Sequence, residues 1–564
     1  MTCNEKILSE DYGELIIDFT VPVEIQDPII AECLTVVNER FSIAYVPLNY
    51  IDRFTSSLYR YDNGSRVYGL MQEAFDPISL ANSGIIRTQR PPLSLTGRGV
   101  VMAFIDTGIR YAEPMFLNSA GNTRLLTIWD QTIQTGTPPD GYNYGSLFTR
   151  DDINKALQAK NPYAVVPSTD EDGHGTAMAS VAAGSILDGG YTFWGAAPEA
   201  DIVVIKLRQA KKYLRDFYFI PEGVPAYGGA DIMLGVKFAE SFARTMQKPV
   251  VICIGMGTNT GNHVLGSPLA RYLNDIAINR NRSVVICGGN EGNAAHHFSG
   301  SVPEGVNGYR DVEIRVGEGE GGFLVEMWGN VPNIFDASVK TPGGETIPRF
   351  KLGVGSGQRY TFVYEKTVIT IQSILVEAAT GEELIIFRFE APTPGVWTIR
   401  VFNQPDEGNG VFNMWLPITQ FLKSNTFFLN SSPYITLTDP GIAEGAITVS
   451  TYNDVNNSFY VNSGRGFLRN GMIKPDFAAP GVGISTALGR RTGSSLAAAI
   501  TAGGVAQFLQ WAVVQQNNLL ITNPELKSYF IRGATRSSDL EYPNRNWGYG
   551  RLNVTGVFDV MARV

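Results

Sequence analysis

The chain has 564 residues, of which 44% are hydrophobic and 18% are charged. This length exceeds one typical domain and the composition excludes an intrinsically disordered protein, so we expect two or three globular domains. The net charge is −9, and Lys and Arg form no cluster along the sequence. Both observations argue against a nucleic acid partner.

The N-terminal sequence and the cysteines indicate the compartment in which the protein is made. Residues Met1–Lys6 lack the basic and apolar segments of a secretory signal, so we expect synthesis in the cytoplasm without such a signal. Four cysteines are too few for a disulfide framework in a chain of this size. Cys253 and Cys287 lie in apolar runs, which predicts small buried side chains in neighbouring strands.

Residues 1–75 predict a small α+β unit at the start of the chain. Glu14–Phe19 and Phe41–Val46 have the composition of strands, and Asp27–Arg40 between them predicts an amphipathic helix. Taken alone, these patterns are typical of a structural N-terminal domain.

From residue 76 onward, apolar runs alternate with helical stretches. Arg98–Ile105 and Ile202–Ile205 are nearly continuous apolar runs, which is typical of parallel strands that helices cover on both faces. The helical stretches His174–Gly184 and Ala230–Met246 alternate with such runs. We therefore predict an α/β fold with a doubly wound parallel sheet.

The pattern changes at about residue 299. Asp311–Val316, Tyr360–Tyr364 and Gly395–Phe402 alternate between apolar and polar residues, and turn residues separate them. No segment with a helical period lies between these runs. The sequence therefore predicts an inserted β-sandwich of the jelly-roll type over residues 299–420.

Three residues in a fixed order carry the chemistry of a nucleophilic hydrolase. Asp106 ends an apolar run, His174 opens an Ala-rich helix, and Ser495 opens a second, longer helix. A serine hydroxyl is a poor nucleophile at neutral pH, so a histidine must accept its proton and a carboxylate must orient that histidine. The order Asp, His, Ser separates this arrangement from the trypsin-like and α/β-hydrolase orders and matches the subtilisin-like order.

Around these three residues the sequence resembles the subtilisin-like serine proteases. Ser283–Gly292 is similar to the strand and turn that present the oxyanion-hole asparagine, and Lys474–Val482 is similar to the segment before the serine. The resemblance implies that Asp106 orients His174, that His174 acts as general base and acid, and that Ser495 attacks. It also implies that Asn290 and the Ser495 backbone N–H form the oxyanion hole.

The same resemblance implies where a substrate binds. Gly255, Met256 and Gly257 match the strand that pairs with the substrate backbone, where glycine lets another chain approach closely. Gly288 and Gly289, directly before the oxyanion-hole position, are implied as further substrate-binding residues. A plain turn at residues 255–257 is the alternative interpretation.

Within the subtilases, the chain resembles the clostridial spore germination proteases, the Csp family. The features in common are the N-terminal unit, the missing secretory signal, the inserted β-domain and the run Ser495–Gly503, in which Ala499 replaces the usual proline. This resemblance implies a propeptide-like domain at residues 1–75, a catalytic domain at 76–298 and 421–564, and a jelly roll at 299–420. The apolar segment 496–514 is then a core helix, so no membrane span is expected.

The Csp resemblance implies a function, two partners and a location. It implies an autoprocessing serine endopeptidase of the bacterial spore that cleaves a protein zymogen, the precursor of a spore cortex hydrolase, during germination. The second partner is its own propeptide, which serves as bound inhibitor and folding chaperone. A catalytically silent subtilase-fold protein in germinant sensing and a generic degradative subtilase are the alternatives.

No cofactor or metal is expected. His296 and His297 are adjacent and lack a third ligand nearby, so a zinc site is not predicted. No loop has the ordered Asp and Asn spacing of a calcium site, although subtilases often bind calcium. His263 is expected in a loop near the substrate cleft, in a structural or a substrate-binding role.

Overall fold

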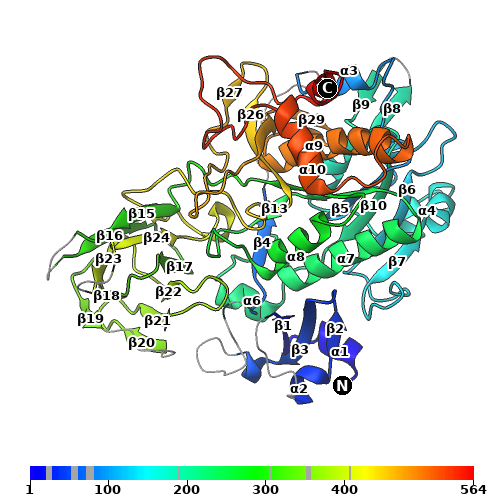
Figure 1. Cartoon of the computed structure of the whole chain (residues 1–564). Coiled ribbons are helices and arrows are strands. Elements are labelled where there is room, and N and C mark those ends of the chain that lie inside the picture. Colours follow the sequence, from blue (N-terminus) through cyan, green and yellow to red (C-terminus); the bar gives the residue numbers. More distant parts are fainter. Residues whose placement is uncertain are drawn as a thin grey trace.

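The protein is described here by a computed structural model. The structure describes residues 1–563 except residues 21–27, 52–60, 62, 72–79, 81, 189–190, 304–307, 351–356 and 405–407. Figure 1 shows a small N-terminal unit in blue, a central α/β region, and a separate lobe of antiparallel strands in green and yellow. The expected boundary between residues 75 and 76 lies outside the described residues.

A mostly parallel sheet of nine strands forms the centre of the structure, in the order β27-β26-β14-β12-β5-β10-β6-β7, with β28 beside β26. Its strands are β5 (Val101–Asp106), β6 (Leu125–Asp130), β7 (Ser146–Thr149), β10 (Asp201–Lys206), β12 (Val250–Ile254), β14 (Arg282–Cys287), β26 (Ile447–Asn453), β27 (Ser458–Phe459) and β28 (Phe477–Pro480). Only β7 and β27 pair antiparallel to their neighbours in this sheet. The predicted α/β class with a parallel sheet is confirmed.

Helices cover both faces of this sheet. The helices of the α/β region are α3 (Ile85–Thr88), α4 (Arg150–Leu157), α5 (His174–Ala183), α6 (Lys212–Phe217), α7 (Gly229–Thr245), α8 (Pro268–Ala277), α9 (Ser494–Leu509), α10 (Asn523–Gly533) and α11 (Val554–Met561). Met102 and Phe104 of β5 share one apolar cluster with α5 and α9, whereas Ala103 and Ile105 share the opposite cluster with α7 and α8. Successive strand residues point to opposite faces, so burial on both faces accounts for the continuous apolar run.

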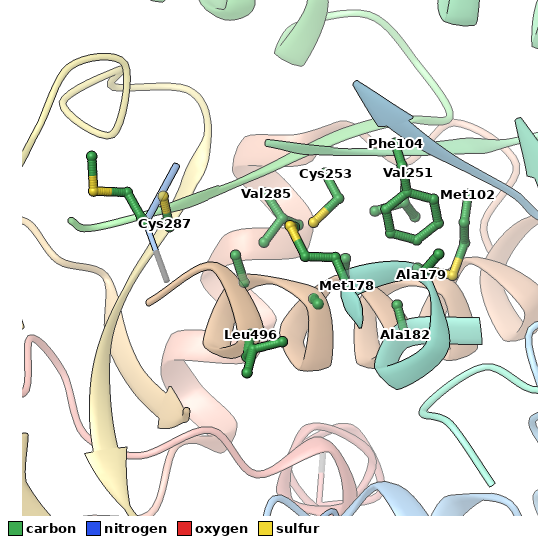
Figure 2. Packing of buried hydrophobic residues seen from close by; sticks show 14 of the residues in the cluster. Met102, Phe104, Met178, Ala179, Ala182, Val251, Cys253, Val285, Cys287 and Leu496 are labelled. Carbon is green, nitrogen blue, oxygen red and sulfur yellow. The ribbon is translucent and has the colours of Figure 1, made fainter. Parts of the chain in front are cut away.

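Helix α9 and the π-helical turn η5 (Gln510–Val514) form one long apolar helical stretch. Within the described part of the chain, this stretch alone has the length and composition of a membrane span, and 83% of its apolar window is buried inside the protein. Figure 2 shows α9 and α5 beneath the sheet, with Cys253 and Cys287 close by. Both cysteines are buried and unpaired and lie in the neighbouring strands β12 and β14, as the sequence predicted.

The N-terminal unit is a three-stranded antiparallel sheet in the order β1-β3-β2. Its elements are α1 (Cys3–Leu8), β1 (Tyr12–Asp18), α2 (Pro28–Ala31), β2 (Leu34–Val36), β3 (Phe41–Pro47) and η1 (Leu48–Tyr50). The predicted helix Asp27–Arg40 is wrong from Glu32 onward, since only Pro28–Ala31 is helical, and Asp27 lies outside the described residues. The β-branched run Thr35–Val37 favours a strand, and the Asn38 side chain accepts hydrogen bonds from the N–H groups of Arg40 and Phe41, which forms the turn.

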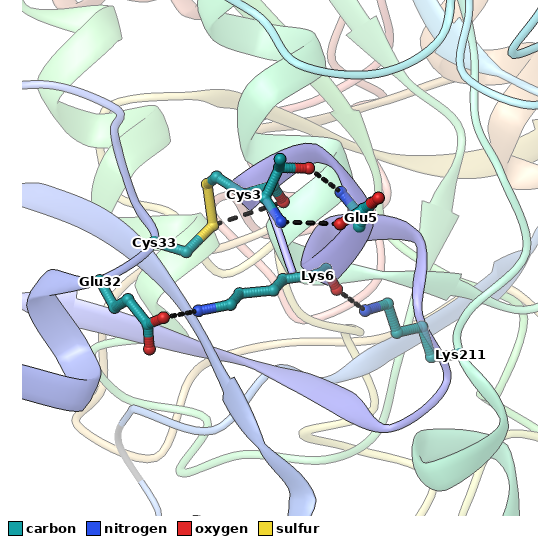
Figure 3. Close-up of a disulfide and its surroundings, with 7 residues drawn as sticks. Cys3, Glu5, Lys6, Glu32, Cys33 and Lys211 are labelled. Atoms are coloured by element: carbon teal, nitrogen blue, oxygen red, sulfur yellow. Dashed lines mark hydrogen bonds and ion pairs between the residues drawn. A yellow bond between two sulfur atoms is a disulfide. The ribbon is translucent and has the colours of Figure 1, made fainter.

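A disulfide joins Cys3 of α1 to Cys33 before β2 (Figure 3), a bond that the number of cysteines did not predict. Lys6 of the same helix forms an ion pair with Glu32. Lys211, from the α/β region, donates hydrogen bonds to the carbonyl oxygens of Ser9 at 2.9 Å and Tyr12 at 2.8 Å. The disulfide and the ion pair lie within the N-terminal unit, whereas the two Lys211 hydrogen bonds hold this unit against the α/β region.

The antiparallel lobe consists of two sheets that share one apolar core. One sheet has the order β15-β24-β17-β22-β21-β20 and the other β19-β18-β23-β16-β25. The strands are β15 (His297–Ser301), β16 (Arg310–Val316), β17 (Gly322–Gly329), β18 (Phe335–Lys340), β19 (Thr346–Phe350), β20 (Gly357–Thr361), β21 (Val368–Ile374), β22 (Glu383–Glu390), β23 (Gly395–Asn403), β24 (Val411–Trp415) and β25 (Phe427–Phe428). Phe389 of one sheet packs on Trp397 of the other, with ring centroids 5.4 Å apart.

Short elements complete the fold. They are β4 (Val67–Leu70), β11 (Tyr227–Gly228) and β13 (Met256–Gly257), the hairpins β8 (Ser185–Asp188) with β9 (Tyr191–Trp194) and β29 (Ile484–Thr486) with β30 (Gly489–Arg491), and the 3-10 turns η2 (Pro114–Phe116), η3 (Pro162–Ala164) and η4 (Thr419–Phe421). Strand β4 lies apart from the sheet of the N-terminal unit, between β11 and β13 (Figure 1).

Candidate active site

The three residues of the expected triad lie at ends of secondary structure elements. Asp106 is the last residue of β5, His174 is the first residue of α5, and Ser495 lies in the first turn of α9. Because α5 and α9 pack against each other and against β5, the fold brings these three positions to one end of the sheet. Polar groups at the carboxyl ends of parallel strands are the usual place for a site in such folds.

The structure joins the carboxylate to the imidazole directly. Asp106 Oδ1 lies 2.7 Å from His174 Nδ1, and both side chains are buried. Burial by itself lowers the pKa of His174, but the charge and hydrogen bond of Asp106, together with the charges of Asp172 and Asp170, outweigh burial, so that pKa is raised above its usual 6.5. Among the described residues, neither His174 Nε2 nor Ser495 Oγ has a hydrogen-bond partner. The ring nitrogen that faces away from Asp106 is thus free to accept a proton.

Gly175 lets helix α5 approach the end of β5 closely. A Cβ atom at this position would collide with the carbonyl oxygen of Gly108 and would lie 3.1 Å from the Asp106 Cβ. Backbone cannot yield as a flexible side chain can, so the short distance between Asp106 and His174 depends on glycine here.

Asp170 is a site residue that the sequence analysis missed. Its Oδ1 accepts hydrogen bonds from Thr107 Oγ1 at 2.7 Å and from the Gly173 N–H at 2.8 Å. Its Oδ2 accepts from the backbone and the hydroxyl of Thr176, at 2.8 and 2.6 Å. This buried carboxylate therefore ties the loop after Asp106 to the first turn of α5. The only feature of the sequence that could have pointed to Asp170 is a threonine shortly after each of two triad residues.

Asn290 lies in the turn after β14, beside the start of α9. Its Oδ1 accepts a hydrogen bond from the Ser494 N–H at 3.1 Å, which orients the amide and leaves its NH₂ group for another acceptor. The Ser495 N–H donates to the carbonyl oxygen of Met71 at 3.3 Å. The carbonyl of Met71, the residue after β4, thus reaches one of the two donors that the sequence analysis assigned to the oxyanion hole.

Strand β4 lies antiparallel between β11 and β13. Leu70 pairs with Met256 and Gly69 pairs with Gly257, while the Met71 N–H donates to the Gly255 carbonyl at 3.1 Å. The structure therefore places Gly255, Met256 and Gly257 against a second backbone, in the geometry of strand addition.

Gly288 and Gly289 differ from these three residues, because within the described part of the chain neither forms a backbone hydrogen bond with β4. The Gly288 N–H donates to Val449 and its carbonyl accepts from Thr438, while the Gly289 carbonyl accepts from Gly464. Both glycines thus bond to the scaffold, in the turn that presents Asn290.

A buried polar pocket receives the side chains of β4 and its preceding residue. The Tyr68 hydroxyl lies 3.1 Å from Ser267 Oγ and 3.2 Å from Asp439 Oδ1. Arg66 donates to the carbonyl of Thr260 at 3.1 Å and lies 3.8 Å from Asp439 Oδ2. The sequence analysis did not find Asp439, because nothing near it in the sequence marks it as a ligand for another segment.

The remaining histidines have structural partners. His263 stacks on Trp415 with ring centroids 4.1 Å apart, and burial lowers its pKa to about 3. His297 lies on Trp415 at 4.6 Å, and burial lowers its pKa to about 4. His296 Nδ1 lies 2.7 Å from Glu291 Oε2. Within the described ranges, no three His, Cys, Asp or Glu side chains are grouped as metal ligands would be.

Comparison with known proteins agrees with the fold and this geometry. A model of the subtilase family matches residues 97–310 and 427–550, more than half of the chain. The chain therefore belongs to the subtilase family, a family of serine proteases. The unmatched stretch between these ranges holds most of the antiparallel lobe.

Solved structures place the chain more narrowly. It is similar to the CspB protease of Clostridium perfringens, with a TM-score of 0.76, 29% identity, and coverage of 86% of this chain and 97% of that one. Fervidolysin from Fervidobacterium pennivorans also matches, with a TM-score of 0.45, 13% identity, and coverage of 97% of this chain and 61% of that one. No curated protein shows a significant match to the sequence. The protein is thus a subtilisin-like protease related to CspB.

Proposed function

We propose that this subtilisin-like protease cleaves its own chain after Met71 and afterwards cleaves a protein zymogen. The observation that carries the proposal is the position of the Met71 carbonyl, whose oxygen accepts a hydrogen bond from the Ser495 N–H. A peptide carbonyl at this donor, beside an unpaired serine hydroxyl, is positioned as a substrate carbonyl.

The proposed reaction uses the triad in its usual roles. Ser495 Oγ attacks the carbonyl carbon while His174 Nε2 takes the hydroxyl proton, and Asp106 stabilises the imidazolium that forms. The Ser495 N–H and the Asn290 amide hold the negative oxygen. The C–N bond then breaks, and His174 returns the proton to the departing amine. Water, deprotonated by His174, hydrolyses the acyl-serine ester and restores the hydroxyl.

The N-terminal segment is then the first substrate and a product that blocks the cleft. Because β4 pairs on both edges and Tyr68 is buried, the segment keeps its contacts after the bond is cut. The proposed cut lies close to the end of the propeptide-like domain that the Csp resemblance implies at residues 1–75.

The choice of a zymogen as the later substrate depends on similarity. The Csp resemblance of the sequence and the structural similarity to CspB support a role in spore germination, with the precursor of a cortex hydrolase as substrate. The same reasoning supports a location in the bacterial spore. The role of the N-terminal unit as inhibitor and chaperone is part of this proposal.

A denaturing gel and an active-site probe test the proposal together. The purified protein should give two bands that mass spectrometry assigns to a cut after Met71, and Ser495→Ala should give one band. A fluorophosphonate should label Ser495 in the wild type, because only a serine activated by His174 reacts. A Ser495→Ala chain that is cut at the wild-type rate in pure form excludes self-cleavage. A wild-type chain that is neither cut nor labelled supports the silent signalling alternative.

A further inference from the structure

Residues 416–421, which we call the roof segment, connect the antiparallel lobe to the cleft. The segment follows β24 and contains η4. Gln420 Nε2 donates a hydrogen bond to the carbonyl oxygen of Leu70 at 2.6 Å. The inserted lobe thus contacts the strand that lies in the cleft, on the residue before Met71.

The roof segment also limits the space beside Gly69. A Cβ atom at Gly69 would lie 2.5 Å from Gln420 Nε2 and 2.6 Å from Ile418 Cδ1, closer than real Cβ contacts. Ile418 is only 1% exposed and belongs to the large apolar cluster of the α/β region, so its side chain has little room to turn away. Any residue larger than glycine at this position must therefore displace one or both side chains.

Hydrogen bonds fix the roof segment to the turn that carries Asn290. The backbone and the hydroxyl of Thr419 each donate to Glu291 Oε1 at 3.1 Å, and His296 lies on the other oxygen of Glu291. Asn259 donates to the Leu416 carbonyl at 3.1 Å from the opposite direction. A shift of the roof segment would therefore disturb the residue next to the oxyanion-hole asparagine.

We propose that the roof segment makes the protease selective for glycine at the third residue before the scissile bond. The proposal rests on the proposed cut after Met71, which makes Gly69 that third residue. It names the substrate class as protein segments that are extended at the cut and have glycine at this position. An alanine there would either move Ile418 or lift the segment, so that the scissile carbonyl leaves the Ser495 N–H. We expect a loss of roughly 10- to 100-fold in kcat/KM, the range that overpacking of a fixed site produces.

Paired peptides test this selectivity. The first peptide has the sequence of residues 66–74, Arg-Val-Tyr-Gly-Leu-Met-Gln-Glu-Ala, and the second has alanine in place of the glycine. The enzyme's own N-terminal segment blocks a fraction of the clefts, but this fraction is the same for both peptides. The ratio of their kcat/KM values therefore does not depend on it. We expect the wild type to prefer the glycine peptide at least tenfold. We expect Ile418→Ala to lower that preference to below threefold, because it opens the space that a Cβ needs.

A control variant and a second reaction keep the test decisive. Ile371→Ala removes the same atoms from the core of the antiparallel lobe and should leave the preference unchanged. In the intact chain, Gly69→Ala should slow self-cleavage at least tenfold and Ile418→Ala should restore it. Gly321→Ala, where a Cβ meets nothing within 4 Å, should have no effect.

The outcomes separate this inference from the proposed function. Equal cleavage of the two peptides by an enzyme that takes the fluorophosphonate overturns the glycine selectivity and leaves the protease. If that enzyme cuts neither peptide, the rate of self-cleavage in Gly69→Ala decides, and an unchanged rate overturns the inference. A chain that takes no probe and cuts nothing overturns both.

Discussion

Replacing Asp170 with Asn should disable the site without touching any triad residue. Asp170 accepts four hydrogen bonds, two on each oxygen, and two of them come from the backbone N–H groups of Gly173 and Thr176. Asparagine has the same shape but only one accepting oxygen. One of these N–H groups, in the first turn of α5, must then face an NH₂ group. Because His174 begins that turn, its position relative to Asp106 depends on this carboxylate.

The magnitude follows from the bonds that are lost. Hydrogen bonds to a charged acceptor contribute about 1.5–3 kcal/mol each, and an unsatisfied buried N–H costs about 1–3 kcal/mol. One of the two bonds on the altered oxygen can be recovered, since a threonine hydroxyl can turn to accept from the new NH₂ group. We therefore expect a loss of about 2–4 kcal/mol in the free energy of unfolding. A misplaced imidazole should also slow the reaction of Ser495 by about two orders of magnitude.

The assay is the rate of fluorophosphonate labelling in the folded fraction, measured against pH. The charge of Asp170 contributes to the raised pKa of His174, so Asp170→Asn should lower that pKa. Labelling requires neutral His174 and is lost as the pH falls through this pKa, so the acid limb should move to lower pH. Asp140→Asn at an exposed position is the control. Labelling at the wild-type rate with an unmoved acid limb would refute the reasoning.

Three further predictions concern the triad, the pocket of β4 and the disulfide. His174→Ala should leave less than about a tenth of the labelling rate, because Ser495 then lacks a proton acceptor, and greater retention would mean that another base acts. In the uncleaved Ser495→Ala chain, Tyr68→Phe should lower stability to urea by about 1–2 kcal/mol, since the Asp439 carboxylate loses a donor. The buried hydroxyl of Tyr45 has no hydrogen-bond partner among the described residues, so Tyr45→Phe should lower the stability to urea less. Equal losses of stability in the two variants would contradict the pocket assignment. Cys3→Ser should destabilise the N-terminal unit by about 3–4 kcal/mol in calorimetry, because the bond closes a loop with a sequence separation of 30, and an unchanged transition would contradict this.

The sequence was sufficient wherever a residue lies inside a regular pattern. Asp106 ends an apolar strand and His174 begins an apolar helix, so periodicity and motif order located both before the structure was known. The continuous apolar runs predicted the parallel sheet, because a strand that is buried on both faces has no exposed position for a polar residue. The helix predicted over Asp27–Arg40 was wrong because the helical period there is weak. The β-branched run favours a strand and Asn38 favours a turn.

Residues that act across the chain left no such pattern. Asp170 and Asp439 are acidic residues in loops, and their partners are donors that only the folded chain brings near. Ile418 and Gln420 belong to a segment that looks like any end of a β-domain, yet they lie against Gly69, far away in the sequence. Local propensity contains no information about such distances, so these four residues required the structure.

The roof segment changes how the inserted lobe should be tested. A lobe that is joined to the catalytic domain at both ends can brace that domain without contributing a catalytic residue, and deletion of residues 299–420 is the direct test of such a role. That deletion also removes Ile418 and Gln420 and cuts the segment that Glu291 holds through Thr419. A loss of activity would then have two causes that the deletion cannot separate. Single substitutions separate these two causes. Ile371→Ala weakens the core of the lobe, so a bracing role predicts lower stability for this variant. Ile418→Ala opens the cleft, so a role in substrate recognition predicts relaxed selectivity for this variant.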